Sequence, residues 1–276
     1  MKAVARALDV SRSNLWDRAH GRHPGRPIRY SKVDDGLLLQ SIRKICDRRG
    51  SYGYRRTAAI LGRLREAQGL ERINHKRVHR IMKAHGLLLR RHGTKPTRTH
   101  DGKIITLTSN LRWCSDSFFI RCWNQEMVEV AFAMDTCDRE VMAYVATTAA
   151  ITGEMIRDLM AESVEQRFGR VERAPHPIQW LSDNGPPYTA AETRLFAEHL
   201  GLVPCTTPSY SPQSNGMSEA FVKTFKRDYV YLSELPTAED VLRQLQGWCE
   251  DYNEWAPHKG LRMKSPRQFR RLNMSA

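Results

Sequence analysis

The feature that most limits the fold is a run of three apolar, strand-forming segments between residues 112 and 148. They occupy Arg112–Arg121, Met127–Met134 and Glu140–Thr148, and all are rich in β-branched and aromatic residues. Only short turns, around residues 124–125 and 136–138, separate them. Strands joined by such short turns pair with their neighbours and run antiparallel, so this region predicts a three-stranded meander.

Helices and short strands alternate after this meander. The pattern runs helix, strand, helix, strand, at Thr152–Phe168, Ile178–Leu181, Ala191–Leu200 and Val203–Thr206, as the hydrophobic periodicity indicates. A further helix follows these elements. The order β-β-β-α-β-α-β-α predicts a mixed α/β fold in which helices cover both faces of one sheet.

Three acidic residues stand in or beside these elements. Asp116 lies within the first apolar strand, Asp183 opens the turn after the strand Pro177–Leu181, and Glu219 falls in the first turn of a helix that continues over Ala220–Asp228. A carboxylate in an apolar strand is costly unless it meets a cation. Carboxylate oxygens are ligands that Mg²⁺ prefers, and two such ions can activate a nucleophile and stabilise a leaving oxygen at phosphorus.

The residues around these acids form an ordered set of motifs. The sequence has W-x-x-D ending at Asp116, D-N-G-x-x-Y starting at Asp183, and S-P-x-S-N-G-x-x-E-x-F at Ser211–Phe221, with 35 residues between Asp183 and Glu219. This set resembles the DDE, or integrase-core, family of transposases and retroviral integrases. The resemblance implies a ribonuclease-H-like core that cleaves DNA and transfers the cut strand.

The same resemblance implies a cofactor and site residues. Asp116, Asp183 and Glu219 would be both catalytic residues and metal ligands, holding two Mg²⁺ ions, with Mn²⁺ as a substitute. A basic residue at the position of Lys226 contacts DNA near the site in this family. Lys223 is aligned with Glu219 one helical turn further on, so it is a second predicted DNA contact.

Flanking motifs extend the resemblance over residues 30–272. YGYRR at Tyr52–Arg56 and NHKRVHRIMKAHGL at Asn74–Leu87 are similar to the helical domain of bacterial insertion-sequence transposases of the orfB type, and YNEWAPHKGLRMKSP at Tyr252–Pro266 is similar to their C-terminal signature. The implied partners are DNA, as element end and as target, further copies of the chain on that DNA, and the product of an upstream frame, alone or as a fusion. The chain departs from the pattern at Ser182, where Thr is common, and at Ala256, where Arg is common.

The first hundred residues are strongly basic. They hold 25 Lys and Arg against 7 Asp and Glu, whereas the net charge of the whole chain is +14, and such a basic front favours a polyanionic partner. Helices are predicted at Asp34–Arg49, Tyr54–Ala67 and Asn74–His85, which indicates a helix-turn-helix. The predicted DNA-binding side chains of this region are Arg55, Arg56, Lys76, Arg77, Arg80 and Lys83.

Five segments follow from these observations. Residues 1–29 hold a partial helix-turn-helix and a basic linker, residues 30–90 a helical DNA-binding domain, and residues 91–104 a second basic linker. Residues 105–232 form the catalytic core and residues 233–276 a helical extension. Within the core, Thr207–Gly216 is predicted to be a flexible loop that becomes ordered when DNA and metal bind.

Several other classes are disfavoured. No apolar run is long enough to cross a membrane, no G-x-S-x-G elbow or Walker loop is present, and six scattered cysteines without C-x-x-C indicate reduced thiols. The predicted location is therefore the bacterial cytoplasm, in association with the nucleoid. Two alternatives stay open: a ribonuclease-H-like nuclease that cuts without joining, and a DNA-binding regulator without enzymatic activity.

Overall fold

The computed structural model describes residues 2–7, 16, 19–20, 32–90, 106–206 and 216–274. The chain divides into two compact units, residues 1–41 and residues 42–276. Helix α1 (Lys2–Ala7) belongs to the first unit, and helix α3 (Asp35–Arg48) crosses the boundary. The basic linker predicted at residues 91–104, much of the segment 1–29, and residues 207–215 of the predicted loop lie outside the described residues.

A mixed sheet with the strand order β3-β2-β1-β4-β5 organises the larger unit. Strands β1 (Arg112–Arg121), β2 (Met127–Asp135) and β3 (Val141–Thr147) pair antiparallel, which confirms the predicted meander. Strand β4 (Ile178–Ser182) pairs in parallel with β1, and β5 (Leu202–Thr206) pairs in parallel with β4. The mixed α/β order expected from the sequence is therefore present.

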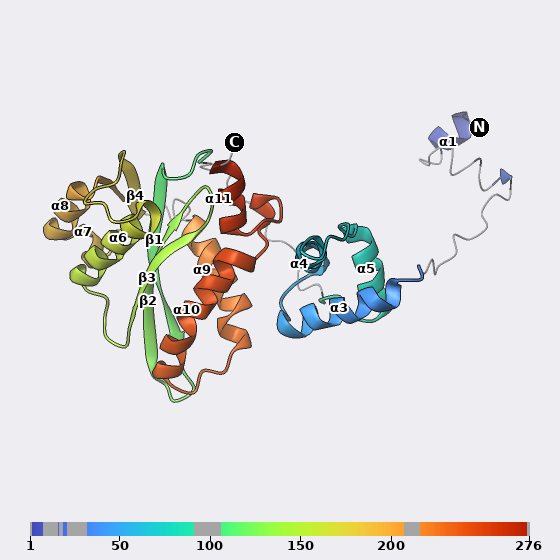
Figure 1. Ribbon diagram of the computed structural model, residues 1–276, viewed down its shortest axis with the longest axis horizontal. Coiled ribbons are helices and arrows are strands. Elements are labelled where there is room, and N and C mark those ends of the chain that lie inside the picture. Colours follow the sequence, from blue (N-terminus) through green and yellow to red (C-terminus); the bar gives the residue numbers. More distant parts are fainter. Residues whose placement is uncertain are drawn as a thin grey trace. The chain divides into compact units, whose positions relative to one another are not determined.

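Helices cover both faces of this sheet (Figure 1). Helices α6 (Gly153–Phe168), α7 (Pro186–Thr189) and α8 (Ala191–His199) lie on one face, and α9 (Gly216–Asp228) and α10 (Ala238–Trp255) lie on the other. A short helical turn, η2, joins α9 to α10. After α10 come a second short helical turn, η3, and helix α11. These last three elements span Val230–Leu232 (η2), Lys259–Leu261 (η3) and Pro266–Met274 (α11).

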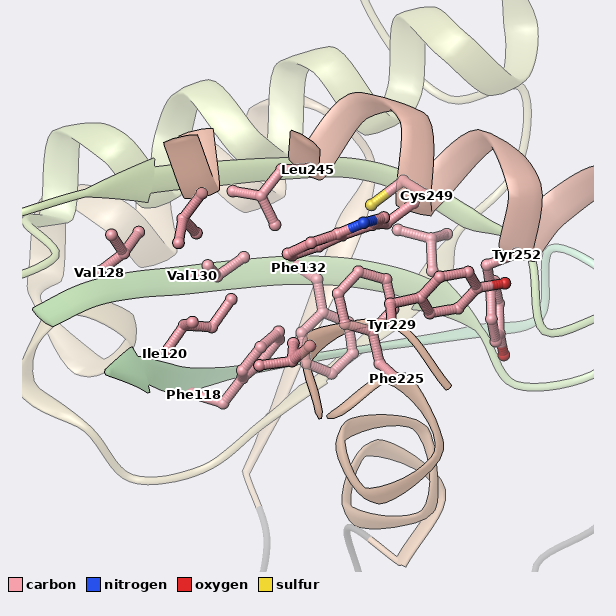
Figure 2. Packing of buried hydrophobic residues seen from close by; sticks show 14 of the residues in the cluster. Phe118, Ile120, Val128, Val130, Phe132, Phe225, Tyr229, Leu245, Cys249 and Tyr252 are labelled. Atoms are coloured by element: carbon pink, nitrogen blue, oxygen red, sulfur yellow. The ribbon is translucent and has the colours of Figure 1, made fainter. Parts of the chain in front are cut away.

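Aromatic rings fill the core between the sheet and helices α9 and α10. Figure 2 shows Phe118, Phe132, Phe225 and Tyr252 among its members. The ring centroid of Phe225 lies 5.8 Å from that of Phe118, and the ring of Phe221 lies 4.3 Å from that of Phe132. Burying each large side chain contributes about 1.5–3 kcal/mol, and aromatic pairs at such distances add to it. This packing fixes α9 against β1.

A second core fills the space between the sheet and α6 to α8. Trp113 on β1 and Trp180 on β4 are 0% and 1% exposed, with ring centroids 6.5 Å apart. Ile156 and Leu159 of α6 pack in the same cluster. Both tryptophans are therefore core residues.

Helices α4 (Tyr54–Glu66) and α5 (His75–Ala84) pack together and match the predicted helix-turn-helix region. The Asn74 side chain accepts a hydrogen bond from the Lys76 backbone N–H, which satisfies one donor at the start of α5. At its other end Gly86 has a φ of 69°, a left-handed value that suits glycine after a helix. The buried face of α5 consists of Val78, Ile81 and Met82, as the pattern predicted.

Two local features differ from the sequence expectation. The stretch after Asp183 was interpreted only as a turn, but Pro186–Thr189 forms the short helix α7. Proline is tolerated there because the first helical turn needs no backbone donor. Helix α9 begins at Gly216, earlier than the predicted Ala220.

Among the described residues, no helix is both long and apolar enough to span a lipid bilayer.

Candidate active site

Asp116 and Asp183 come to the same level of two neighbouring strands. Strand β1 pairs in parallel with β4, and Cys114 lies opposite Leu181. Asp116 is two residues beyond Cys114, and Asp183 is two residues beyond Leu181, so both continue the same register. Neighbouring strands are about 4.8 Å apart. The sheet therefore brings together two acids that are distant in the sequence.

A tight turn holds the Asp183 side chain just beyond the end of β4. Its Oδ1 accepts a hydrogen bond of 2.9 Å from the backbone N–H of Gly185, an Asx turn that is common after a strand. A Cβ atom at Gly185 would lie 3.0 Å from this same oxygen. A side chain at this position would therefore crowd the carboxylate, and its oxygen would have to shift.

Glu219 lies in the first turn of α9, with an exposed side chain. The preceding residue, Ser218, is buried and forms a side-chain hydrogen bond with the Cys114 thiol of β1. On the next turns Phe221 and Phe225 are buried in the aromatic core. These contacts fix the start of α9 over β1. Glu219 is therefore held next to the strand that carries Asp116.

The three acids act on one another electrostatically. Burial raises the pKa of Asp116 to about 6, a hydrogen bond from the Ser117 backbone N–H opposes the rise, and the negative charges of Asp183 and Glu219 add to it. Like charges raise a carboxyl pKa in this way only when they are near neighbours. The structure therefore gathers the three predicted acids into one region of negative charge.

This donor set suits Mg²⁺ chemically, because it offers hard carboxylate oxygens on three separate elements. A divalent cation would also relieve the repulsion that raises the pKa of Asp116. Within the ranges that the structure describes, however, no group of three or more Asp, Glu, His or Cys side chains already has the spacing to hold a metal ion. The three acids share a region without yet forming a closed coordination site.

Tyr188 supports the site from the opposite face of the sheet. Its side chain is buried, and its hydroxyl lies 2.9 Å from the Ser115 hydroxyl in a hydrogen bond. Burial raises the pKa of Tyr188. The sequence placed Tyr188 in the D-N-G-x-x-Y motif but did not reveal this contact, which links the turn after Asp183 to the residue before Asp116.

The two predicted lysines of α9 have different surroundings. Lys226 is half-buried, its Nζ atom lies 5.5 Å from the centroid of the Phe118 ring on β1, and burial lowers its pKa. Lys223 is exposed on the same helix. A cation over the strand that contains Asp116 is well placed to meet a phosphate near the acids.

The basic side chains predicted on the helical unit are mostly accessible. Lys76 and Lys83 of α5 are exposed, whereas Arg77 and Arg80 are half-buried. Arg55 at the start of α4 is exposed and lies with its guanidinium 5.1 Å from the Tyr54 ring centroid. The four basic side chains of α5 lie away from the buried face of that helix.

Arg56 differs from the other predicted DNA contacts. Its Nη2 donates to Asp228 of α9 at 2.7 Å, and its guanidinium lies 3.6 Å from the Tyr52 ring centroid. Burial would raise the pKa of Asp228, but hydrogen bonds from Arg227, Arg56 and Ser51 hold it below its usual value. The structure thus gives Arg56 an ion pair with a buried carboxylate, which the sequence did not indicate because Asp228 lies far along the chain.

A buried charge network at the other end of β1 was not predicted. Arg167 of α6 donates to Asp138 at 3.0 Å and to Glu140 at 3.1 Å, and lies 3.6 Å from Asp135. All of these side chains are 3% exposed or less. The sequence predicts a turn at residues 136–138 but no ion pair there. The available sequence signal was a group of acids beside an apolar strand. It gave no indication that Arg167 would pair with them.

Three domain families match the sequence. The integrase core domain matches residues 107–212, a second integrase core domain family matches residues 201–266, and an HTH-like domain matches residues 32–95. The core matches span β1 to η3 and include Asp116, Asp183 and Glu219, and the HTH-like match spans α3 to α5.

Curated relatives and a solved structure are similar over much of the chain. Transposase InsD for insertion element IS2D from Escherichia coli is 42% identical over 273 residues, covering 97% of this chain and 90% of the relative. An uncharacterized insertion element IS136 protein from Agrobacterium fabrum is 56% identical over 187 residues, covering 67% of this chain and 95% of the relative. A cryo-electron microscopy structure of the simian T-cell lymphotropic virus intasome, in complex with PP2A regulatory subunit B56 gamma, shares the fold at a TM-score of 0.50 and 18% identity, covering 77% of this chain and 73% of that one.

Proposed function

The chain belongs to the insertion-element transposases with an integrase core, and on that premise we propose that it cleaves DNA at element ends and transfers the cut strand to a target. The observation that supports this most directly is the gathering of Asp116, Asp183 and Glu219 into one region: burial raises the pKa of Asp116, and the charges of the other two acids add to the rise. Such a region is costly unless a cation occupies it, and a bound cation would in turn attract a phosphate.

We assign the three carboxylates as metal ligands. When bound, a pair of Mg²⁺ ions, or of Mn²⁺ ions as a substitute, would supply a lowered water pKa and stabilise charge on the leaving oxygen. Asp116 and Asp183 offer oxygens from adjacent strands, and Glu219 offers them from α9. The register of β1 and β4 supports the first pair, and the hydrogen bond between Ser218 and Cys114 supports the position of the third.

The remaining residues of the site position the substrate. Lys226, half-buried over Phe118, and the exposed Lys223 would bind backbone phosphates beside the scissile bond. The first step is hydrolysis at an element end, and the second is attack by the released 3′-hydroxyl on another phosphodiester. In both steps the attacking and leaving oxygens are in line at phosphorus, and the protein needs no covalent nucleophile of its own.

We further propose the wider arrangement of the reaction. Residues 30–90 and residues 105–232 would act as the DNA-binding and catalytic domains, joined by the basic linker at residues 91–104 and followed by the extension at residues 233–276. Basic composition in the first hundred residues supports DNA as the partner. Strand transfer at two ends requires more than one copy of the chain on the DNA, with or without the product of an upstream frame.

Single substitutions test the catalytic assignment. Asp116→Asn, Asp183→Asn and Glu219→Gln should each lower nicking of an element-end duplex by more than about 100-fold, because even the loss of a residue that only orients a metal ligand costs 10–100-fold. Duplex binding should remain. Asp158→Asn, an exposed acid of α6, is the matched control and should keep wild-type activity. Wild-type nicking by Asp183→Asn would contradict the assignment.

The ribonuclease-H-like nuclease is distinguished in the same experiment. A transposase joins the freed 3′-end to a second duplex, whereas a nuclease only releases cut products. The joined product should therefore appear with the wild-type chain and disappear together with nicking in the three variants. Nicking without any joined product, under conditions that support both steps in a related transposase, would favour the nuclease.

A further inference from the structure

A cavity of about 510 Å³ lies in the larger unit, outside the candidate active site. Its walls come from three places in the sequence: helix α4, the start of α5 and the segment that follows η3. No acidic side chain lines it within the described part of the chain. Its basic lining residues are Arg55, Arg63, Arg72, His75, Arg262 and Lys264.

Arg63 joins the two walls of this basic cavity. Its Nη1 donates to the Trp255 carbonyl at 2.9 Å, and its Nη2 donates to the Met263 carbonyl at 3.0 Å. The guanidinium is thereby committed to main-chain oxygens and fixes the C-terminal segment against α4.

A strained turn presents the C-terminal cations to the cavity. Arg262 and Met263 have φ values of 54° and 64°, a left-handed conformation that costs energy in residues other than glycine. The turn is closed by two main-chain hydrogen bonds, from the His258 N–H to the Lys264 carbonyl and from the Met263 N–H to the His258 carbonyl. Both Arg262 and Lys264 therefore project from a backbone that is held in one conformation.

Positive charge in the cavity is not balanced by acids. Burial, together with the charges of Arg72 and Arg49, lowers the pKa of Arg63 to about 10. Glu66 pairs with Arg72 at the rim, but among the described residues no acidic side chain pairs with Arg55, Arg262 or Lys264. The first residues of α5 also line the cavity, and the positive end of a helix dipole lies there.

We propose that this cavity binds a backbone phosphate of DNA, held from one side by Arg55 and from the other by Arg262 and Lys264. The proposal rests on the proposed function, because it takes DNA as the polyanion. Guanidinium groups match the geometry of phosphate oxygens. One phosphate would then be shared by the helix-turn-helix region and the C-terminal signature, so that DNA binding requires both.

The salt dependence of DNA binding tests this proposal. Each phosphate contact contributes about 0.9 to the slope of log K against log salt concentration. Because the cavity holds a single phosphate, the double variant Arg262→Gln/Lys264→Gln should lower the slope for an element-end duplex by nearly one unit, and Arg55→Gln alone should lower it by up to the same amount. A double variant of equal charge, Arg170→Gln/Arg194→Gln, changes two exposed cations outside the cavity and should keep the wild-type slope.

The outcomes separate this proposal from the one on which it rests. A wild-type slope in both cavity variants, with DNA binding intact in the wild-type chain, would overturn the phosphate site but leave the transposase reaction standing. Wild-type chain that binds no duplex at all would overturn both. Thermal unfolding checks that each variant is folded, and Arg55→Gln keeps the test decisive if the C-terminal turn fails to form. If inorganic phosphate alone stabilises the wild-type chain more than the variants while the slopes agree, the cavity binds a small anion and the proposal is wrong.

Discussion

Replacing Arg167 by Met should remove the one cation that, among the described residues, contacts all three acids of the buried network. Arg167 lies within 3.6 Å of Asp135, Asp138 and Glu140, and its side chain is 0% exposed. Glu140 keeps ion pairs with Arg267 and Arg270 from α11. The other two acids keep only hydrogen bonds from backbone N–H groups among the described residues.

The expected loss of stability is about 3–5 kcal/mol, because breaking a buried pair leaves an uncompensated charge. This is a large part of the roughly 5–15 kcal/mol that stabilises a typical domain. The melting temperature should fall by roughly 10 °C for a unit of this size. Methionine has a similar length and fills most of the space, so the effect reports charge and not an empty cavity.

The pH dependence has a definite sign. Burial and the charge of Asp138 raise the pKa of Asp135 to about 6, while Arg167 opposes the rise. A carboxyl whose pKa is raised on folding contributes stability below its unfolded pKa of about 3.9, and this is lost as the pH rises through the folded value. Without Arg167 the pKa of Asp135 rises further. The deficit of Arg167→Met should therefore be larger at about pH 8 than at about pH 5.

Urea unfolding followed by tryptophan fluorescence measures both effects, since Trp113 and Trp180 are buried in the adjacent core. Arg157→Met is the matched control on the same helix. Arg157 lies 3.5 Å from the exposed Glu192, and such a surface pair contributes about 1 kcal/mol at most. A deficit in Arg167→Met no larger than that of Arg157→Met, or one that shrinks as the pH rises, would refute this reasoning.

Three further changes have separate readouts. Gly185→Ala should slow nicking while the melting temperature changes little, because the new Cβ would meet the Asp183 carboxylate at 3.0 Å; wild-type rates would show that this oxygen is free to move. Tyr188→Phe should cost about 1 kcal/mol in urea unfolding through the lost hydrogen bond to Ser115, and Tyr231→Phe, an exposed control, should cost nothing measurable. Burial and the charges of Arg139 and Arg56 lower the pKa of His258 to about 3, so its stabilising effect is complete above about pH 6.5 and is lost as the pH falls. Between about pH 6 and pH 4, the free energy of unfolding should fall with decreasing pH less steeply in His258→Gln than in the wild-type chain, by up to about 1.4 kcal/mol per pH unit. Parallel curves of unfolding free energy against pH would contradict the lowered pKa of His258.

The sequence predicted the sheet well because each strand is defined by its own residues. Arg112–Arg121 and Met127–Met134 are apolar, end at turn residues, and form β1 and β2 within one residue of the expected bounds. The bounds of helix α5 also follow from nearby residues, since Asn74 and Gly86 mark its ends. The motifs around the acids also named residues that the sheet register brings to one level.

The remaining features depend on contacts that no local pattern encodes. Tyr188 reaches Ser115 only because β4 lies beside β1, and Arg56 forms its ion pair only because Asp228 meets it from α9. Both partners are distant in the sequence, and exposed and buried arginines look alike in a basic segment. The cavity behind Arg63 likewise exists only after the C-terminal turn packs on α4.

Metal binding tests the central claim most directly, because it does not depend on the rate of any step. Mn²⁺ is titrated into the chain bound to element-end DNA, and the free ion is measured by electron paramagnetic resonance. The wild-type chain should bind about two ions per site, Asp116→Asn, Asp183→Asn and Glu219→Gln should each lose that binding, and Asp158→Asn should keep it. Unchanged Mn²⁺ binding in all three variants would contradict a metal centre formed by these acids.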